Sequence, residues 1–111
     1  MKSGAYKIRS EVWLYPGEAP WHFVTVPKKQ SEEIKKKFGA MKSSHTTIAR
    51  LRRSGWGSLP VAVTIGKTSW NTSIFPDKRE GAYILPLKAE VRKKERVVPG
   101  ETISFSLKIE I

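Results

Sequence analysis

Two cationic side chains in the C-terminal half have a spacing that could bind an anion. Lys88 and Arg92 are four residues apart, so on a helix they lie one turn apart and present two positive charges to one point. Trp70, Thr72 and Ser73 could add a stacking face and hydroxyl groups beside them. The pattern predicts a site for an anionic small ligand or polyanion built on Trp70, Thr72, Ser73, Lys88 and Arg92.

The same side chains fit a plainer interpretation, which the sequence alone favours. Lys88 and Arg92 would pair on the surface with the nearby carboxylates of Glu90, Glu95 or Glu101. The tryptophan would then be an aromatic residue of the core or of its rim.

Positive charge is the strongest compositional signal. The 111 residues carry a formal net charge of +11, which attracts polyanions whether or not the cell uses that attraction. Composition favours a charge that only keeps the protein in solution. The alternative is sequence-nonspecific nucleic-acid binding through a basic segment, with contacts predicted at Lys36, Lys37, Arg50, Arg52, Arg53 and, as a stacking residue, Trp56.

No motif for catalysis or metal binding is present in the sequence. Cysteine is absent, which removes disulfides, thiolate ligands and cysteine nucleophiles together. No carboxylate stands at a spacing from His22 or His45 that would make a metal-ligand set or a proton relay. Ser69 and Ser73 lack the flanking sequence of a nucleophile elbow. We therefore expect no cofactor and a non-enzymatic binding module, with an enzyme of unknown reaction as a further alternative.

A hairpin must position the tryptophan and the hydroxyl groups of the predicted anion site. Val61 to Ile65 alternates between apolar and smaller residues, which predicts a half-buried strand. A turn at Gly66-Lys67 leads back into a second strand from Thr68 to Phe75, and Pro76 should end that strand.

The two cations follow a third strand directly. Ala82 to Leu85 is apolar and aromatic enough to pair in a sheet until Pro86 removes a hydrogen-bond donor. The segment from Leu87 to Lys94 then suits a helix, with Leu87 and Val91 packed and the opposite side charged.

The flanking segments predict further strands and one short helix. Tyr6 to Tyr15 and Trp21 to Val26 should form an antiparallel pair, and Ile103 to Ile111 alternates without error between apolar and polar residues. Ser31 stands where the N-cap of a two-turn helix belongs, with Ile34 and Phe38 facing the sheet.

Residues 41–54 have the weakest structural signal. We expect a mobile or partly helical insertion there, although Ser43 or Ser44 could cap a second helix. A helix-turn-helix is disfavoured because Lys35 and His45 occupy positions where that motif needs small or apolar residues.

The length and the strand count together predict a small barrel. A chain of 111 residues fits one domain spanning residues 1–111, and about six strands in so few residues need their edges closed. No window approaches the ~18 apolar residues that a membrane span needs, so we expect a soluble cytoplasmic protein. The sequence leaves open whether it is a monomer or a homodimer.

Two motifs give the chain a family resemblance. Trp-x-Thr-Ser-x-Phe-Pro runs from Trp70 to Pro76, and Leu-Pro-x-Lys-x-x-Val-Arg runs from Leu85 to Arg92. With Trp13, Trp21, Gly57 to Val61 and Pro99-Gly100-Glu101, they make nearly the whole chain resemble the domain-of-unknown-function family 1905. The resemblance implies a mainly β fold, a six-or-so-stranded double-split β-barrel or pseudo-barrel with one or two short helices. The DNA-binding proteins AbrB and MazE share that architecture, and the family itself brings no established activity.

Overall fold

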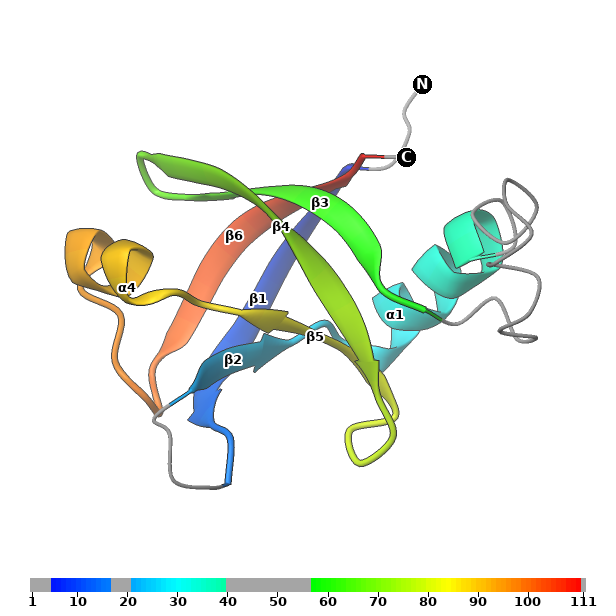
Figure 1. The fold of residues 1–111 in the computed structure, drawn as a ribbon, viewed down its shortest axis with the longest axis horizontal. Coiled ribbons are helices and arrows are strands. Elements are labelled where there is room, and N and C mark those ends of the chain that lie inside the picture. Colours follow the sequence, from blue (N-terminus) through cyan, green and yellow to red (C-terminus); the bar gives the residue numbers. More distant parts are fainter. Residues whose placement is uncertain (1–4, 17–20, 40–56, 111) are drawn as a thin grey trace.

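The computed structural model describes residues 5–16, 21–39 and 57–110. In these ranges six strands form a closed barrel in the order β1-β2-β5-β4-β3-β6, and every neighbouring pair is antiparallel. The strands are β1 (Ala5–Leu14), β2 (His22–Thr25), β3 (Leu59–Ile65), β4 (Thr68–Asp77), β5 (Ala82–Pro86) and β6 (Thr102–Ile109). The helices are α1 (Lys28–Ile34), continued by a π-helical turn η1 (Lys35–Gly39), and α4 (Ala89–Glu95), and Figure 1 shows α1 and α4 on opposite sides of the barrel.

The two longest strands each change partner along their length. The first seven residues of β1 pair with β6, and Val12 to Leu14 pair with β2. In the same way, Thr68 to Ile74 of β4 pair with β3, and Phe75 to Asp77 pair with β5. Residues 70–72 of β4 pair with β3 on one side and have no β5 partner on the other. The barrel wall is therefore split beside these residues.

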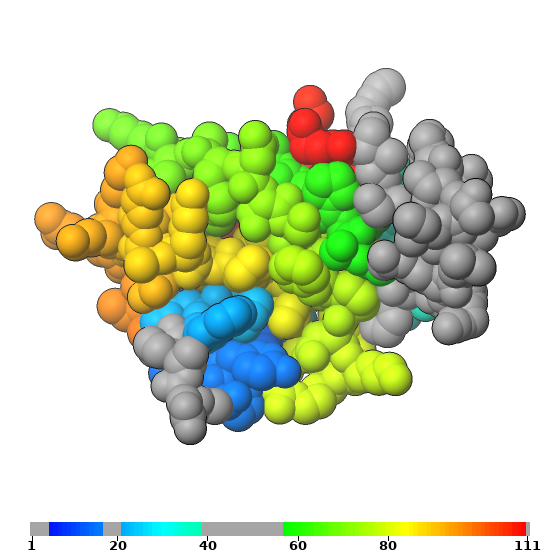
Figure 2. Space-filling view, viewed as in Figure 1, coloured from blue at the N-terminus to red at the C-terminus, as the bar shows by residue number. Residues whose placement is uncertain are grey.

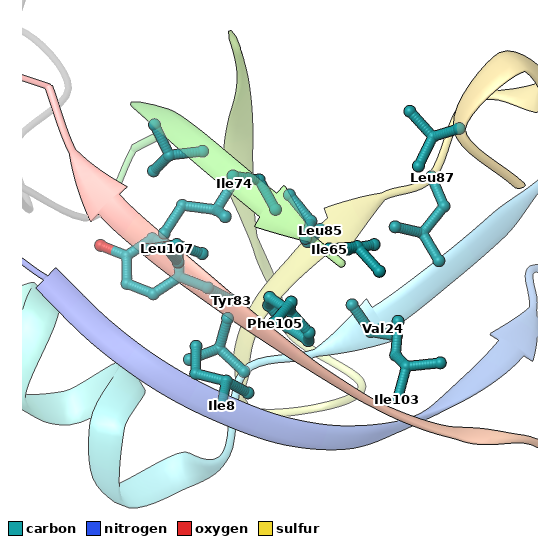
Figure 3. Packing of buried hydrophobic residues seen from close by; sticks show 14 of the residues in the cluster. Ile8, Val24, Ile65, Ile74, Tyr83, Leu85, Leu87, Ile103, Phe105 and Leu107 are labelled. Carbon is teal, nitrogen blue, oxygen red and sulfur yellow. The ribbon is translucent and has the colours of Figure 1, made fainter. Parts of the chain in front are cut away.

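The barrel interior is filled by alternate side chains of the strands. Ile103, Phe105, Leu107 and Ile109 of β6 are all buried, which confirms the alternation predicted for the last segment. Figure 3 shows residues of β1, β2, β3, β4, β5 and β6 meeting in this core. The expected hairpin is also confirmed, since Ile65 pairs with Thr68 across Gly66-Lys67 and Gly66 adopts a φ of 57°.

Several predicted boundaries are wrong. The helix predicted from Leu87 to Lys94 begins at Ala89, and Lys88 is its N-cap residue with an extended backbone. Ser31 is not an N-cap, because α1 begins at Lys28 after Pro27 and the Ser31 side chain is buried. Its hydroxyl donates to the Val26 carbonyl and accepts from the Tyr83 N–H, which joins the helix to β5. Pro76 does not end β4, because it pairs with Tyr83 of β5. Beyond Ile74 the strand β4 has β5 on one side and no β3 partner on the other, so a residue without an N–H donor is tolerated there.

The fold class predicted from the sequence is confirmed as a mainly β, six-stranded barrel with two short helices. Ile34 is buried and Phe38 packs against the core, as expected. The predicted insertion at 41–54 lies outside the described residues. No helix in the described ranges is long and apolar enough to cross a membrane.

Candidate functional site

A cavity of about 260 Å³ opens where β4 separates from β5, beside α4. We call it the α4 cleft, and its lining residues are Trp21, His22, Phe23, Trp70, Asn71, Thr72, Pro86, Leu87, Lys88 and Arg92. Figure 2 shows the face on which the surfaces of β2, β4, β5 and α4 border one another. Four of the five residues of the predicted anion site, Trp70, Thr72, Lys88 and Arg92, line this one cavity.

Ser73, the fifth residue of the predicted site, is not among the lining residues. Thr72 pairs with Val61, which is buried in the barrel, whereas Ser73 pairs with Pro60. Since successive side chains of a strand point to opposite faces, Ser73 lies on the other face of β4 from Thr72. Strand alternation alone does not exclude Ser73, because Asn71 lies on the same face of β4 as Ser73 and still lines the cleft.

The two cations of the α4 cleft are held close to the end of β5. The Leu87 N–H donates to the His22 carbonyl at 2.9 Å, and the Leu87 side chain is buried in the core. Arg92 donates its backbone N–H to the Lys88 carbonyl at 3.1 Å and its side-chain Nε–H to the Leu87 carbonyl at 3.0 Å. These bonds fix the first turn of α4 and place Lys88 and Arg92 on the same side of it.

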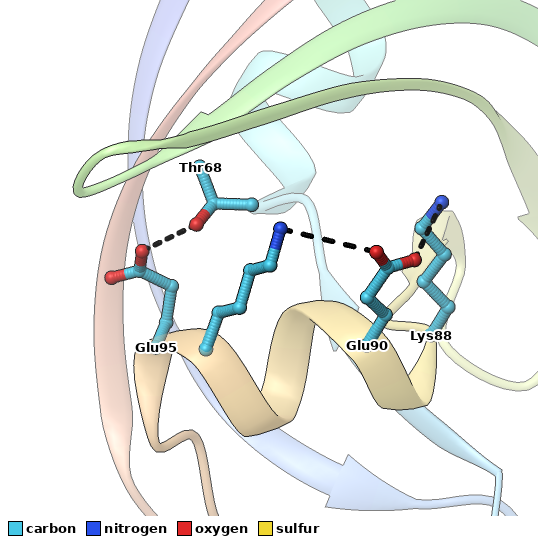
Figure 4. A network of polar contacts seen from close by, with 5 residues as sticks. Thr68, Lys88, Glu90 and Glu95 are labelled. Carbon is cyan, nitrogen blue, oxygen red and sulfur yellow. Dashed lines mark hydrogen bonds and ion pairs between the residues drawn. The ribbon is translucent and has the colours of Figure 1, made fainter.

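The far end of α4 is attached to the β3–β4 hairpin. The Thr68 hydroxyl donates to Oε2 of Glu95 at 2.6 Å, as Figure 4 shows. Oε1 of Glu95 approaches Gly66 so closely that a Cβ atom there would collide with it. The helix is therefore anchored at both ends, to β2 and to the hairpin that carries Trp70.

Lys88 makes only a loose ion pair. Its Nζ lies 3.9 Å from Oε1 of Glu90, and Nζ of Lys94 lies 3.9 Å from Oε2 of the same carboxylate (Figure 4). All three side chains are exposed, and exposed pairs of this kind contribute at most about 1 kcal/mol. Of the other carboxylates considered from the sequence, Glu95 binds Thr68 and Glu101 accepts from the Val98 N–H.

A larger hollow of about 600 Å³ adjoins the α4 cleft on the outside of the barrel. We call it the aromatic groove, and its lining residues are Tyr15, Trp21, Phe23, Thr72, Phe75, Pro76, Asp77, Ile84 and Pro86. Strand pairing sets its floor, since Phe23 lies opposite Pro86 and Ile84 lies opposite Phe75. Four lining residues belong to both hollows: Trp21, Phe23, Thr72 and Pro86.

The sequence did not predict Asn71 as a site residue, although it stands between Trp70 and Thr72. It also did not predict Trp21, His22, Phe23, Pro86 or Leu87. These five reach the cleft because β2 pairs with β5, a contact between segments about sixty residues apart. The sequence signal for these residues was a tryptophan at the start of a predicted strand, and periodicity alone does not say which strands are neighbours.

A third hollow, of about 390 Å³, lies over β1 and β6 and is also basic. Lys7 and Arg9 line it opposite Ser106 and Ser104. It crosses two neighbouring strands of one sheet, whereas the α4 cleft has a helix as one wall. We therefore regard the α4 cleft as the better-formed site.

The residues predicted to contact nucleic acid are described only in part. Lys36 and Lys37 are exposed in η1, and Nζ of Lys37 lies 3.4 Å from Oε2 of Glu33. Arg50, Arg52, Arg53 and Trp56 lie outside the described residues, so nucleic-acid binding there stays a prediction. In Figure 1, α1 and η1 lie on the side of the barrel away from α4.

The two tyrosines whose pKa values are clearly raised, Tyr6 and Tyr83, do not line the α4 cleft. Burial raises the pKa of Tyr83 to about 12. Burial is also the main reason why the pKa of Tyr6 is raised, and the negative charge of Glu33 adds to this effect. Among the described residues, no group of three or more His, Cys, Asp or Glu is placed to hold a metal ion.

Comparison with known proteins gives a family but no activity. No curated protein matches the chain. A family model described as Domain of unknown function (DUF1905) matches residues 9–107, which is most of the chain. The resemblance drawn from the two sequence motifs is thereby confirmed, and the chain belongs to the DUF1905 family.

Proposed function

We propose that this protein is a binding module for a small anionic ligand, which it holds in the α4 cleft. The observation that carries the proposal is the convergence of Lys88 and Arg92, one helical turn apart, on a cavity that Trp21 and Trp70 also line. Concave sites with apolar walls and a few convergent polar groups are the usual form of small-ligand sites.

The cations of the cleft are suited to binding. The bond to Leu87 uses one of the five guanidinium N–H donors of Arg92, which leaves the four donors of its two Nη groups. An anion could replace the loose contact of Lys88 with Glu90 at little cost, because that pair is exposed and 3.9 Å long. The aromatic walls lower the local dielectric constant and so strengthen charge–charge contacts inside the cleft.

Titration calorimetry with inorganic phosphate at low ionic strength tests the proposal. We expect saturable binding that Arg92→Gln weakens about tenfold, since a hydrogen bond to a charged group is worth ~1.5–3 kcal/mol. Lys93→Gln is the matched control, because it removes one exposed charge from the same helix at a residue that does not line the cleft. Lys88→Gln serves as a second variant whose exposed side chain does not support the helix.

Two results would overturn the proposal. One is the absence of phosphate binding to the folded wild-type protein. The other is an equal loss of affinity in Arg92→Gln, Lys88→Gln and Lys93→Gln, which would mean that the net charge alone attracts the anion.

A further inference from the structure

We infer that the ligand is an aromatic acid, with its anionic group in the α4 cleft and its ring system in the aromatic groove. The inference rests on the proposed function and adds the chemical class of the ligand. Its first support is continuity, since both hollows are lined by Trp21, which directly precedes β2, and by Phe23, Thr72 and Pro86.

The second support is the concentration of exposed rings around the groove. Trp21 is 60% exposed, Phe75 is 42% exposed and Tyr15 is 40% exposed, although large apolar side chains are normally buried. All three line the aromatic groove. Rings arranged in this way offer flat faces for stacking with a planar ligand.

These rings stand on a packed base, so the groove is preformed. Phe23 and Ile84 are nearly buried although they lie on the outer face of the barrel. The ring centroid of Phe23 lies 5.4 Å from that of Trp13 and 5.5 Å from that of Tyr15. A preformed surface loses little side-chain entropy when a ligand binds to it.

The third support is the distribution of charge along the two hollows. Lys88 and Arg92 line the α4 cleft, whereas Asp77 is the charged residue among the described residues that line the groove. Arg79 stacks over Tyr15 with its Cζ atom 5.2 Å from the ring centroid, and its neighbour Glu80 accepts a bond from Thr25. The two lining cations lie together in the cleft, and the lining of the groove beyond them is largely apolar and includes the Asp77 carboxylate. This order fits a ligand with a single anionic end better than a chain of phosphates.

Three probes separate this inference from the proposed function. 1-Naphthyl phosphate carries both the ring and the anion, inorganic phosphate carries only the anion, and 1-naphthol carries only the ring. We expect 1-naphthyl phosphate to bind at least tenfold more tightly than either of the others, because stacking on an aromatic side chain adds to the contacts of the anion.

Variants of the groove locate that gain in affinity. Phe75→Ala and Tyr15→Leu should each remove much of the advantage of 1-naphthyl phosphate and leave the affinity for inorganic phosphate unchanged, because both side chains line the groove and neither lines the α4 cleft. Val98→Ala is the control, because Val98 is also an exposed apolar residue, 55% exposed, and lines neither hollow. Phe75→Tyr keeps a ring at the position and should retain the advantage.

Each contrary outcome has a distinct meaning. Equal affinities for 1-naphthyl phosphate and inorganic phosphate would overturn the inference and leave the proposed function in place. Absence of binding by both anions would overturn the two together. Tighter binding of a short single-stranded oligonucleotide than of 1-naphthyl phosphate, with the same dependence on Tyr15 and Phe75, would replace the aromatic acid by a nucleic acid.

Discussion

At the scale of single residues, Tyr83 couples the core of the barrel to pH. The side chain is fully buried in the hydrophobic core, and burial raises the pKa of its hydroxyl to about 12 from an ordinary value of 10.0. The folded protein therefore keeps this proton at a pH where the unfolded chain has lost it. The resulting stabilisation is complete below pH 10 and is lost as the pH rises from about 10 to 12.

A Tyr83→Phe variant isolates this effect from the titration of the lysines. Between pH 9 and pH 11.5 the free energy of unfolding of the wild type should fall by about 2 kcal/mol more than that of the variant. Urea unfolding at the two pH values measures the difference. Parallel pH profiles for the two proteins would show that Tyr83 does not carry the effect.

Residue spacing predicted much of the candidate site but not all of it. Helical spacing paired Lys88 with Arg92 near a strand end, and the neighbouring hairpin brings Trp70 and Thr72 to the cavity that these two cations line. Ser73 does not line that cavity. The β2 residues were missed because the β2–β5 contact depends on barrel closure, which a local pattern does not encode.

At the scale of elements, α4 depends on its anchor to the β3–β4 hairpin. Thr68→Val keeps the shape of the side chain and removes the hydroxyl that donates to Glu95. We expect the free energy of unfolding to fall by about 1 kcal/mol, since this bond is only partly buried. Affinity for phosphate should fall as well, because Arg92 stands one turn before Glu95 on the same helix.

Urea unfolding and calorimetry measure the two effects of Thr68→Val. Thr102→Val, at an exposed position at the start of β6, is the matched control and should change neither quantity. Unchanged stability and affinity in Thr68→Val would contradict the view that the hairpin positions α4.

The elements themselves were largely predictable, and their ends were not. Alternation of apolar residues identified β3 and β6 because each strand has one face in the core. The start of α1 was misplaced because the Ser31 hydroxyl binds the Tyr83 N–H of a distant strand and does not cap the helix. The strand β4 continues through Pro76 because this residue pairs with Tyr83 of β5 and has no β3 partner on its other side.

At the scale of the whole molecule, the split in the barrel wall makes the site. A barrel closed evenly between β4 and β5 would have paired Trp70 and Thr72 with β5 as well as with β3 and left no opening beside α4. The net charge of +11 raises the concentration of anions around the entire surface, but it does not select one position. The basic hollow over Lys7 and Arg9 is therefore the internal comparison for the α4 cleft.

Backbone amide chemical shifts, recorded by NMR during a titration with inorganic phosphate, test the central claim most directly. If the α4 cleft binds the anion, the largest changes will fall on Trp70, Leu87, Lys88 and Arg92, and those at Lys7, Arg9, Ser104 and Ser106 will be small. Largest changes over β1 and β6, or equal changes at basic residues throughout the chain, would contradict the account.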